Sequence, residues 1–211
     1  MRENVKNAIN TIKLVRTFVF VVLTCLFTTA AIIAQDKPAT PAAPAAPPAN
    51  VLSTAAKRQF EQFRNWLIAS AEKMPEESYA YKPIDSVRSY GQVVGHVADA
   101  QYMFCSAIRG EKGPDLKIEA SKTAKADLVT SLKDAFAYCD KAYDGMTDTS
   151  GTELIKFFGN DMPKLGVLGI NNMHNAEHYG NLVTYLRMKG IVPPSSDRPP
   201  PPTPAPAKKQ D

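Results

Sequence analysis

The sequence predicts an all-α fold, a bundle of four helices with an apolar N-terminal segment ahead of it and proline-rich stretches on both sides. Apolar residues recur at steps of three and four in four stretches of about twenty residues, the spacing that forms one helix face. No comparable alternation of apolar and polar residues indicates strands. Four helices that each carry one apolar face bury those faces by packing as a bundle.

The first two helices have clear boundary signals. The first is expected over residues 53–74, and Pro75 ends it. The second begins at a capping box, in which Ser89 and Gln92 satisfy each other's free backbone N–H groups, and Gly110 ends it. The apolar stripes of these helices are Phe60, Phe63, Leu67, Ala71 and Met74 in the first, and Val93, Val97, Ala100, Phe104 and Ile108 in the second.

The third and fourth helices complete the predicted bundle. Pro163 suits the first turn of the fourth helix, which is expected to run to about Lys189 before Gly190. The longer connections, 75–88 and 147–162, must then cross the ends of the bundle. The stripe of the third helix has a heptad-like spacing and consists of Leu128, Leu132, Ala135, Cys139, Ala142 and Met146.

Residues 1–34 have the pattern of an export signal. Four basic residues and one acid precede an uncharged apolar run from Thr17 to Ala34, and cleavage after Ala34 is favoured. The run also reaches the lower limit for crossing a bilayer, so an uncleaved membrane anchor stays open as the alternative. In both cases we expect a periplasmic or cell-envelope protein that contacts the membrane only through this segment.

Proline-rich stretches delimit the folded domain. Residues 35–50 form a Pro/Ala-rich linker, and residues 195–211 form a proline-rich tail that we expect to be disordered. Residues 51–194 lie between them and have the length of one ordinary domain with a proper core.

The charge balance excludes nucleic acid as a partner. Residues 1–34 hold four of the 25 bases and one of the 21 acids, so 21 bases face 20 acids in the remainder. Binding to a phosphate backbone needs a clustered basic face, and the nearly neutral residues 35–211 show none. A small-molecule substrate and a homodimer stay open as partners.

Cys105 and Cys139 are the two cysteines beyond the N-terminal segment. An oxidising envelope permits a disulfide between them. Their spacing matches no metal-binding motif. Two small buried thiols on separate helix faces are favoured over a bridge, although the bridge stays open.

All three histidines of the chain are candidates for one metal site. His174 and His178 are four residues apart in the fourth helix and therefore lie about 40° apart on one face. His96 lies beside the apolar stripe of the second helix and should point into the bundle. The alternative is a set of core histidines with neighbours that satisfy them, but burying three unpaired imidazoles is costly.

The second and fourth helices resemble the signature helices of the DinB-like superfamily, in the segments GQVVGHVADAQYMFCSAIRG and NMHNAEHYGNLVTYLRMKGIVPP. The resemblance covers about residues 53–194. It implies a four-helix bundle of up-down-down-up type that binds a divalent ion (zinc, nickel or iron) through three histidines. The matching positions here are His96, His174 and His178.

Four polar residues are candidates for the surroundings of the metal. Asp99, one turn after His96, could accept the distal N–H of an imidazole. Glu177 could serve as a fourth ligand or general base. Asn171 and Asn181 lie on nearly the same face as the histidine pair and could bind a water or substrate. A charged helix edge or a polar layer of the bundle would give the same pattern.

Two functions follow from these residues. The resemblance implies a metal-dependent enzyme of unknown substrate, a hydrolase or a transferase, since some family members are thiol-dependent S-transferases or isomerases. An exported protein has limited access to cytosolic thiols, and Cys105 is expected to face away from the metal, so a thiol-dependent reaction fits less well. The alternative is a non-catalytic metal-binding or stress-associated interaction module.

Overall fold

The computed structural model describes residues 49–197. The predicted export signal, nearly all of the linker and most of the tail lie outside the described residues. Within residues 49–197, no helix has the length and apolarity needed to cross a membrane.

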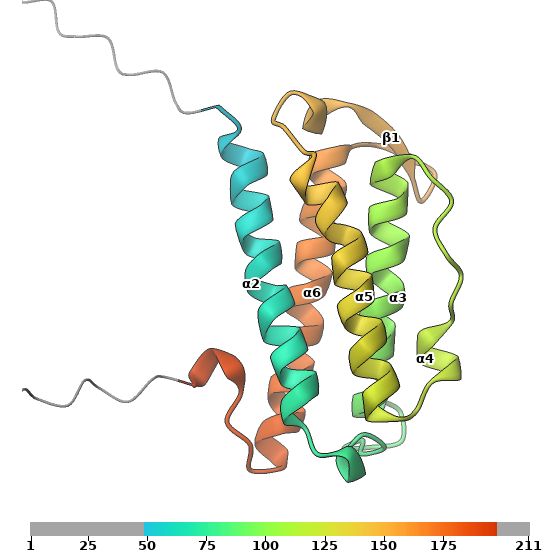
Figure 1. Cartoon of the computed structure of the whole chain (residues 1–211), viewed down its shortest axis with the longest axis vertical. Coiled ribbons are helices and arrows are strands. Elements are labelled where there is room, and N and C mark those ends of the chain that lie inside the picture. Colours follow the sequence, from blue (N-terminus) through green and yellow to red (C-terminus); the bar gives the residue numbers. More distant parts are fainter. Residues whose placement is uncertain (1–48, 198–211) are drawn as a thin grey trace, which may run out of the picture. The chain divides into compact units, whose positions relative to one another are not determined.

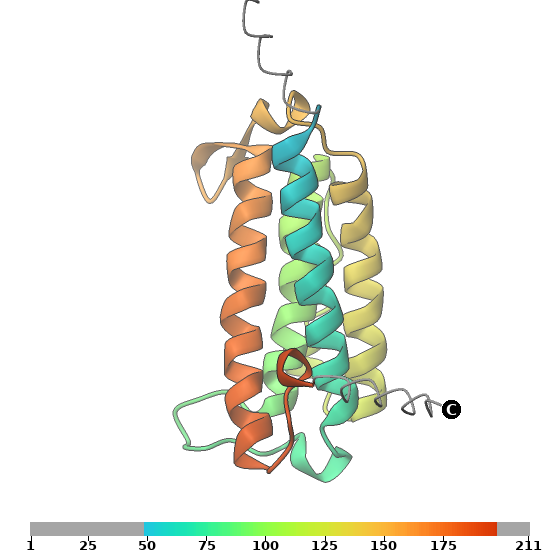
Figure 2. The same ribbon diagram turned by 90° about the vertical axis from the view of Figure 1, so that its left-hand side faces the viewer.

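The described part of the chain is mostly helical, as predicted. Its long helices are α2 (Val51–Lys73), α3 (Tyr90–Arg109), α5 (Lys125–Asp144) and α6 (Lys164–Met188). Both α2 and α3 pack against α5 and α6, so α3 and α6 face each other. Following the colours in Figure 1, α2 and α6 run in one direction and α3 and α5 in the other, and Figure 2 shows the same order from the side.

The boundary signals of α3 are confirmed. The backbone N–H of Gln92 donates to Ser89 Oγ at 3.3 Å, and the N–H of Ser89 donates to Gln92 Oε1 at 2.8 Å. Gly110 caps the other end with a φ of 68°, a left-handed conformation that glycine adopts without a steric penalty. Both ends of the helix that carries His96 are therefore held by local interactions.

The predicted apolar stripes form the core between the helices. Phe60 and Leu67 of α2, Val97 of α3 and Leu132 of α5 are all at most 1 % exposed. Phe60 stacks on Tyr143, with ring centroids 4.0 Å apart. The packed core fixes the relative position of α3, which carries His96, and α6, which carries His174 and His178.

Short elements cross the ends of the long helices. The connection 75–88 contains a 3-10 helix, η1 (Glu76–Ser78), and the α3–α5 connection contains the short helix α4 (Ile118–Ser121). The 3-10 helices η2 (Ser150–Thr152) and η3 (Pro194–Ser196) precede the hairpin and follow α6, respectively. None of these elements was predicted, because each is too short to show a repeat in its apolar residues.

The prediction of a purely helical domain was wrong in one place. Strands β1 (Leu154–Phe157) and β2 (Asn160–Pro163) pair as an antiparallel hairpin. Phe158 and Gly159 join them with φ values of 47° and 81°, which are the positive angles of a type I′ turn. Phe157 is buried and stacks on Phe104 of α3. Strands of four residues are too short for a clear alternating pattern, and so the sequence did not reveal them.

The favoured interpretation of the cysteines as free thiols was also wrong. Cys105 of α3 and Cys139 of α5 form a disulfide, with their Cα atoms 5.3 Å apart. Because α3 and α5 pack together, their facing sides bring the two residues within the span of a disulfide. Sequence spacing carries no information on this pairing.

Candidate metal centre

Three histidine side chains from the facing helices α3 and α6 converge on one point. Nε2 of His174 lies 3.1 Å from Nε2 of His96 and 3.1 Å from Nε2 of His178. The candidate ligand atoms of all three residues lie within 4.8 Å of one another, so the three histidines are positioned to bind one metal ion. His178 is only 5 % exposed, and His96 and His174 are half-buried.

The three Nε2 atoms cannot all satisfy one another by hydrogen bonds, which favours a cation between them. A carboxylate only accepts hydrogen bonds, so the contact of 2.9 Å between His96 Nδ1 and Glu119 Oε2 places the proton on Nδ1 and leaves a lone pair on Nε2. The side-chain nitrogen Nδ2 of Asn181 lies 3.3 Å from Nδ1 of His178 and donates to it, so the proton of His178 lies on Nε2. His174 Nε2 would then have to donate to His96 Nε2 and accept from His178 Nε2 at the same time, which one ring nitrogen cannot do. A divalent ion satisfies all three nitrogens, and neutral imidazoles are good ligands for zinc, nickel and iron.

Burial keeps the histidine pair of α6 neutral. Loss of solvent, followed by the repulsion that two protonated rings would exert on each other, lowers the pKa of His174 beside His178 from 6.5 to about 4. Loss of solvent and the neighbouring His96 have the same effect on His178, whose pKa also falls to about 4. Both rings therefore carry a free lone pair at neutral pH, as metal binding requires.

Glu119 is the acid that orients His96, and it was not among the predicted site residues. Burial works against its charge, but the ion pair with Arg88 and the hydrogen bond from His96 outweigh this and hold the pKa of Glu119 below 4.5. Gly95 explains how α4 comes so close, because a Cβ there would lie 2.7 Å from the Cα of Glu119. A glycine inside the second predicted helix, next to His96, was the signal that could have pointed to a close approach.

Asp99 was predicted to orient a histidine, and the structure gives it another partner. Its two carboxylate oxygens accept the backbone N–H groups of Ile118 and Glu119, at 2.9 and 3.0 Å. These N–H groups open the short helix α4 and have no partner within it, so a carboxylate satisfies them well. Asp99 therefore holds α4 against α3, while Glu119 makes the contact with His96.

The remaining predicted residues separate into two groups. Asn181 lies beside His178, as described above, and Glu177 is exposed. Asn171 faces the core instead of the histidines, and its amide donates to Gln101 Oε1 at 3.1 Å and to Tyr143 at 3.2 Å. It is one turn before His174, and the rotation of the helix takes its side chain toward α5.

An apolar wall closes one side of the histidine cluster. The ring of Phe104 lies edge-on to His174, with centroids 5.6 Å apart, and Phe157 of the hairpin stacks on Phe104. The unpredicted hairpin thus covers the core next to His174 and lowers the polarity around the ligand nitrogens.

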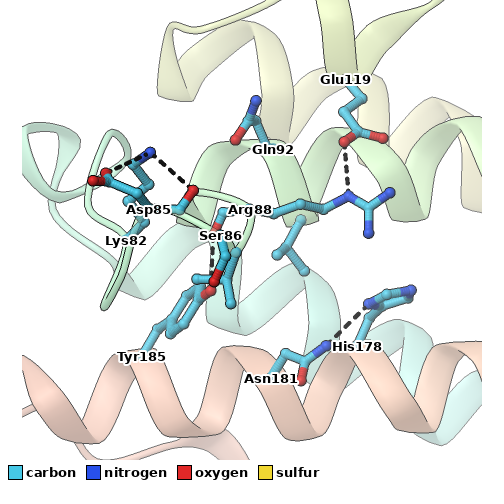
Figure 3. Close-up of a pocket in the computed structure, with 11 residues that line it drawn as sticks. Lys82, Asp85, Ser86, Arg88, Gln92, Glu119, His178, Asn181 and Tyr185 are labelled. Carbon is cyan, nitrogen blue, oxygen red and sulfur yellow. Dashed lines mark hydrogen bonds and ion pairs between the residues drawn. The ribbon is translucent and has the colours of Figure 1, made fainter.

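A cavity of about 670 Å³ opens beside the cluster (Figure 3). It lies between the connection that precedes α3 and the middle of α6. Its lining includes His178, Asn181 and Glu119, and it also includes Arg88, Lys82 and Tyr185. The volume is in the range of sites for small molecules. The cavity therefore gives solvent access to His178, one of the three histidines of the candidate metal centre.

The model of the DinB superfamily matches residues 59–182, which include all three histidines. The chain belongs to the DinB superfamily. Among its relatives, YjoA of Bacillus subtilis (strain 168) is 27% identical over 134 residues, which cover 62% of this chain and 86% of YjoA.

Solved structures of DinB-like proteins have the same fold. A protein from Bacillus cereus ATCC 10987 superposes with a TM-score of 0.60 at 18% identity, covering 67% of this chain and 95% of that one. YjoA superposes with a TM-score of 0.56 at 24% identity, covering 69% and 99%. A mycothiol-dependent maleylpyruvate isomerase gives 0.53 at 12% identity, covering 62% of this chain and 60% of the isomerase. At these identities the similarity is one of fold.

The DinB chain offers a direct test of Glu119. We expect Glu119→Gln to weaken metal binding by about 10–100-fold, because an amide orients His96 less strongly than a carboxylate does. Competition with a chromophoric chelator measures the affinity. Glu177→Gln removes an exposed acid near the same histidines and should leave the affinity within about twofold. Equal affinities for Glu119→Gln and the unmodified protein would show that Glu119 does not support the site.

Stability of the metal-free protein should fall in mildly acidic solution. Below pH 6.5 the unfolded chain protonates His174 and His178, whereas the folded chain resists this until about pH 4. Between these values the free energy of unfolding should fall with pH by at most about 1.4 kcal/mol per unit for each histidine. Urea unfolding at pH 7 and 5.5 measures this, and His178→Ala should show a smaller decrease. A metal-free protein equally stable at both pH values would contradict the buried neutral state.

Proposed function

We propose that this DinB protein is an exported metal-dependent enzyme that acts on a small molecule. The metal would be zinc, nickel or iron, held by His96, His174 and His178 in a DinB-like four-helix bundle. The observation that carries this proposal is the cavity of about 670 Å³ beside the histidine cluster, with His178 in its lining. A metal that serves only stability is usually enclosed by four protein ligands, whereas three ligands and an open side are typical of catalytic sites.

The residues around the centre have distinct parts in this proposal. A divalent ion with three neutral ligands supplies Lewis-acid chemistry, which activates a water or a thiol and polarises a bound substrate. Glu119 keeps His96 in the orientation that points Nε2 at the centre. Asn181 holds His178 from the cavity side and is itself exposed there, so its amide is available to a substrate.

The disulfide bears on the reaction class and on the location. Cys105 and Cys139 are both bonded, so neither can act as a thiol nucleophile or ligand. A thiol-dependent reaction would need a thiol from outside residues 49–197, and hydrolysis needs none. A buried disulfide is typical of proteins that fold in an oxidising compartment. Together with the basic and apolar character of residues 1–34, it supports export to the periplasm or cell envelope.

Cobalt substitution tests whether the centre is open. Co²⁺ takes the place of zinc, and its visible spectrum reports the number and type of ligands. Addition of azide should change the spectrum, because a small anion can reach the open position through the cavity. An unchanged spectrum at saturating azide would indicate a closed site and support the alternative of a non-catalytic metal-binding module. Glu177→Gln is a suitable control, since its spectrum and azide response should match those of the unmodified chain.

A further inference from the structure

Arg88 is a positive side chain at the edge of the candidate metal centre. It has no role in the function proposed above. It precedes the N-cap of α3 and lines the cavity, and its side chain is 45% exposed. Its Nε donates to Glu119 Oε1 at 2.7 Å, so the carboxylate that orients His96 also holds Arg88. The hydroxyl of Tyr185 donates to the backbone carbonyl of Arg88 at 2.7 Å and fixes the main chain at this point.

The end of the Arg88 side chain is free to bind a ligand. Within residues 49–197, its one side-chain hydrogen bond is the one from Nε, so the N–H groups on its two terminal nitrogens have no protein acceptor there. Figure 3 shows the guanidinium between Glu119 and His178, inside the cavity. A guanidinium fork of this kind binds a carboxylate or phosphate group through two parallel hydrogen bonds.

The charges around the cavity favour an anion. The single negative charge of Glu119 balances the positive charge of Arg88. Three neutral histidines add no charge, so a divalent ion at the centre would leave its double positive charge uncompensated. Lys82, the other base in the lining, is already paired with Asp85 at 3.0 Å. In the part of the chain that the structure describes, Arg88 is paired with Glu119 only through Nε, so its terminal N–H groups remain available next to His178 (Figure 3).

We propose that Arg88 anchors the anionic group of the substrate, a carboxylate or a phosphate, and so directs the rest of the molecule toward the three histidines. This inference rests on the proposed metal-dependent function and narrows its substrate to a small anionic molecule. The volume of about 670 Å³ is ample for a small metabolite and too small for a folded partner. Asn181 lies on the opposite wall, on α6, and can contact the same molecule.

Calorimetric titration of the full-length, zinc-loaded protein tests this inference. Succinate and inorganic phosphate are the two probes, and they distinguish a carboxylate site from a phosphate site. We expect one of them to bind, and Arg88→Gln to weaken that binding at least about tenfold, as expected for lost charge-assisted hydrogen bonds. Arg88→Lys retains the charge beside Glu119 but not the fork, so it should also bind more weakly. Arg58→Gln removes an exposed positive charge on α2 and is the control that should bind normally.

The zinc content of each protein separates this inference from the proposed function. The anion site is contradicted if the unmodified chain holds zinc but binds neither probe, or if both Arg88 variants bind the probe as well as the unmodified chain does. The proposed metal centre is unaffected by either result. If the unmodified chain cannot hold zinc, the proposed function itself fails. If Arg88→Gln loses zinc because Glu119 is disturbed, the inference is tested on zinc-loaded Arg88→Lys instead. Its affinity for the probe is then compared with that of the zinc-loaded unmodified chain. Metal-free protein should bind the probe more weakly, and equal binding would place the anion away from the histidines.

Discussion

Replacing His178 with alanine should abolish tight metal binding while the helical fold persists. The ring supplies one of three converging nitrogens, and two imidazoles bind a divalent ion far more weakly than three. We expect the affinity to fall by more than about 100-fold, beyond the loss typical of an outer residue such as Glu119. Packing of the apolar helix faces supplies most of the stability, so the circular dichroism spectrum should remain helical. Elemental analysis after dialysis measures the bound metal.

The control for this variant is a substitution of the preceding residue, Glu177. Glu177→Ala changes an exposed side chain of the same helical turn and should keep the full metal content. His96→Ala, on the facing helix α3, should lose metal as His178→Ala does, because both rings point Nε2 at Nε2 of His174. A full equivalent of tightly bound metal in either histidine variant would contradict the three-histidine site.

Removing the disulfide should lower the free energy of unfolding by about 3–4 kcal/mol. The bridge links residues 34 positions apart, and without it the unfolded chain regains conformational entropy. The bond joins α3, which carries His96, to α5. Urea unfolding of the double variant Cys105→Ala, Cys139→Ala gives the change in the free energy of unfolding. The metal content should be retained, since neither sulfur lies among the candidate ligands.

Two comparisons support the interpretation of that result. The single variant Cys139→Ala should be destabilised to a similar extent, because either substitution removes the bridge. Thiol titration of the unfolded chain, before and after reduction, counts the bridged cysteines independently. Two reactive thiols from this pair before reduction would mean that the bridge does not form, and an unchanged free energy of unfolding would mean that it does not stabilise the fold.

The long helices could be predicted because their signals are local. The capping box at Ser89 and the left-handed Gly110 bound α3 at the positions that the residue types indicate. The histidine cluster could be predicted for a related reason: helical spacing places His174 and His178 on one face, and apolar neighbours place His96 toward the core. The resemblance to the DinB-like superfamily pointed to the same three residues.

The rest of the site depends on contacts that sequence spacing does not encode. Glu119 reaches His96 from a four-residue helix, and that approach is set by a glycine, Gly95, and by the carboxylate of Asp99. Asp99 has the spacing of a partner for His96, yet two free backbone N–H groups compete for it and bind it. The pairing of Cys105 with Cys139 likewise depends on which helices are neighbours.

The most direct test of the central claim is the metal content of the full-length chain, purified without a histidine-containing tag and measured by elemental analysis. Three converging imidazoles predict about one equivalent of zinc, nickel or iron per chain, lost in His178→Ala. A folded chain that contains none of these metals, and takes up none after reconstitution with each, would contradict the metal centre and the function proposed from it.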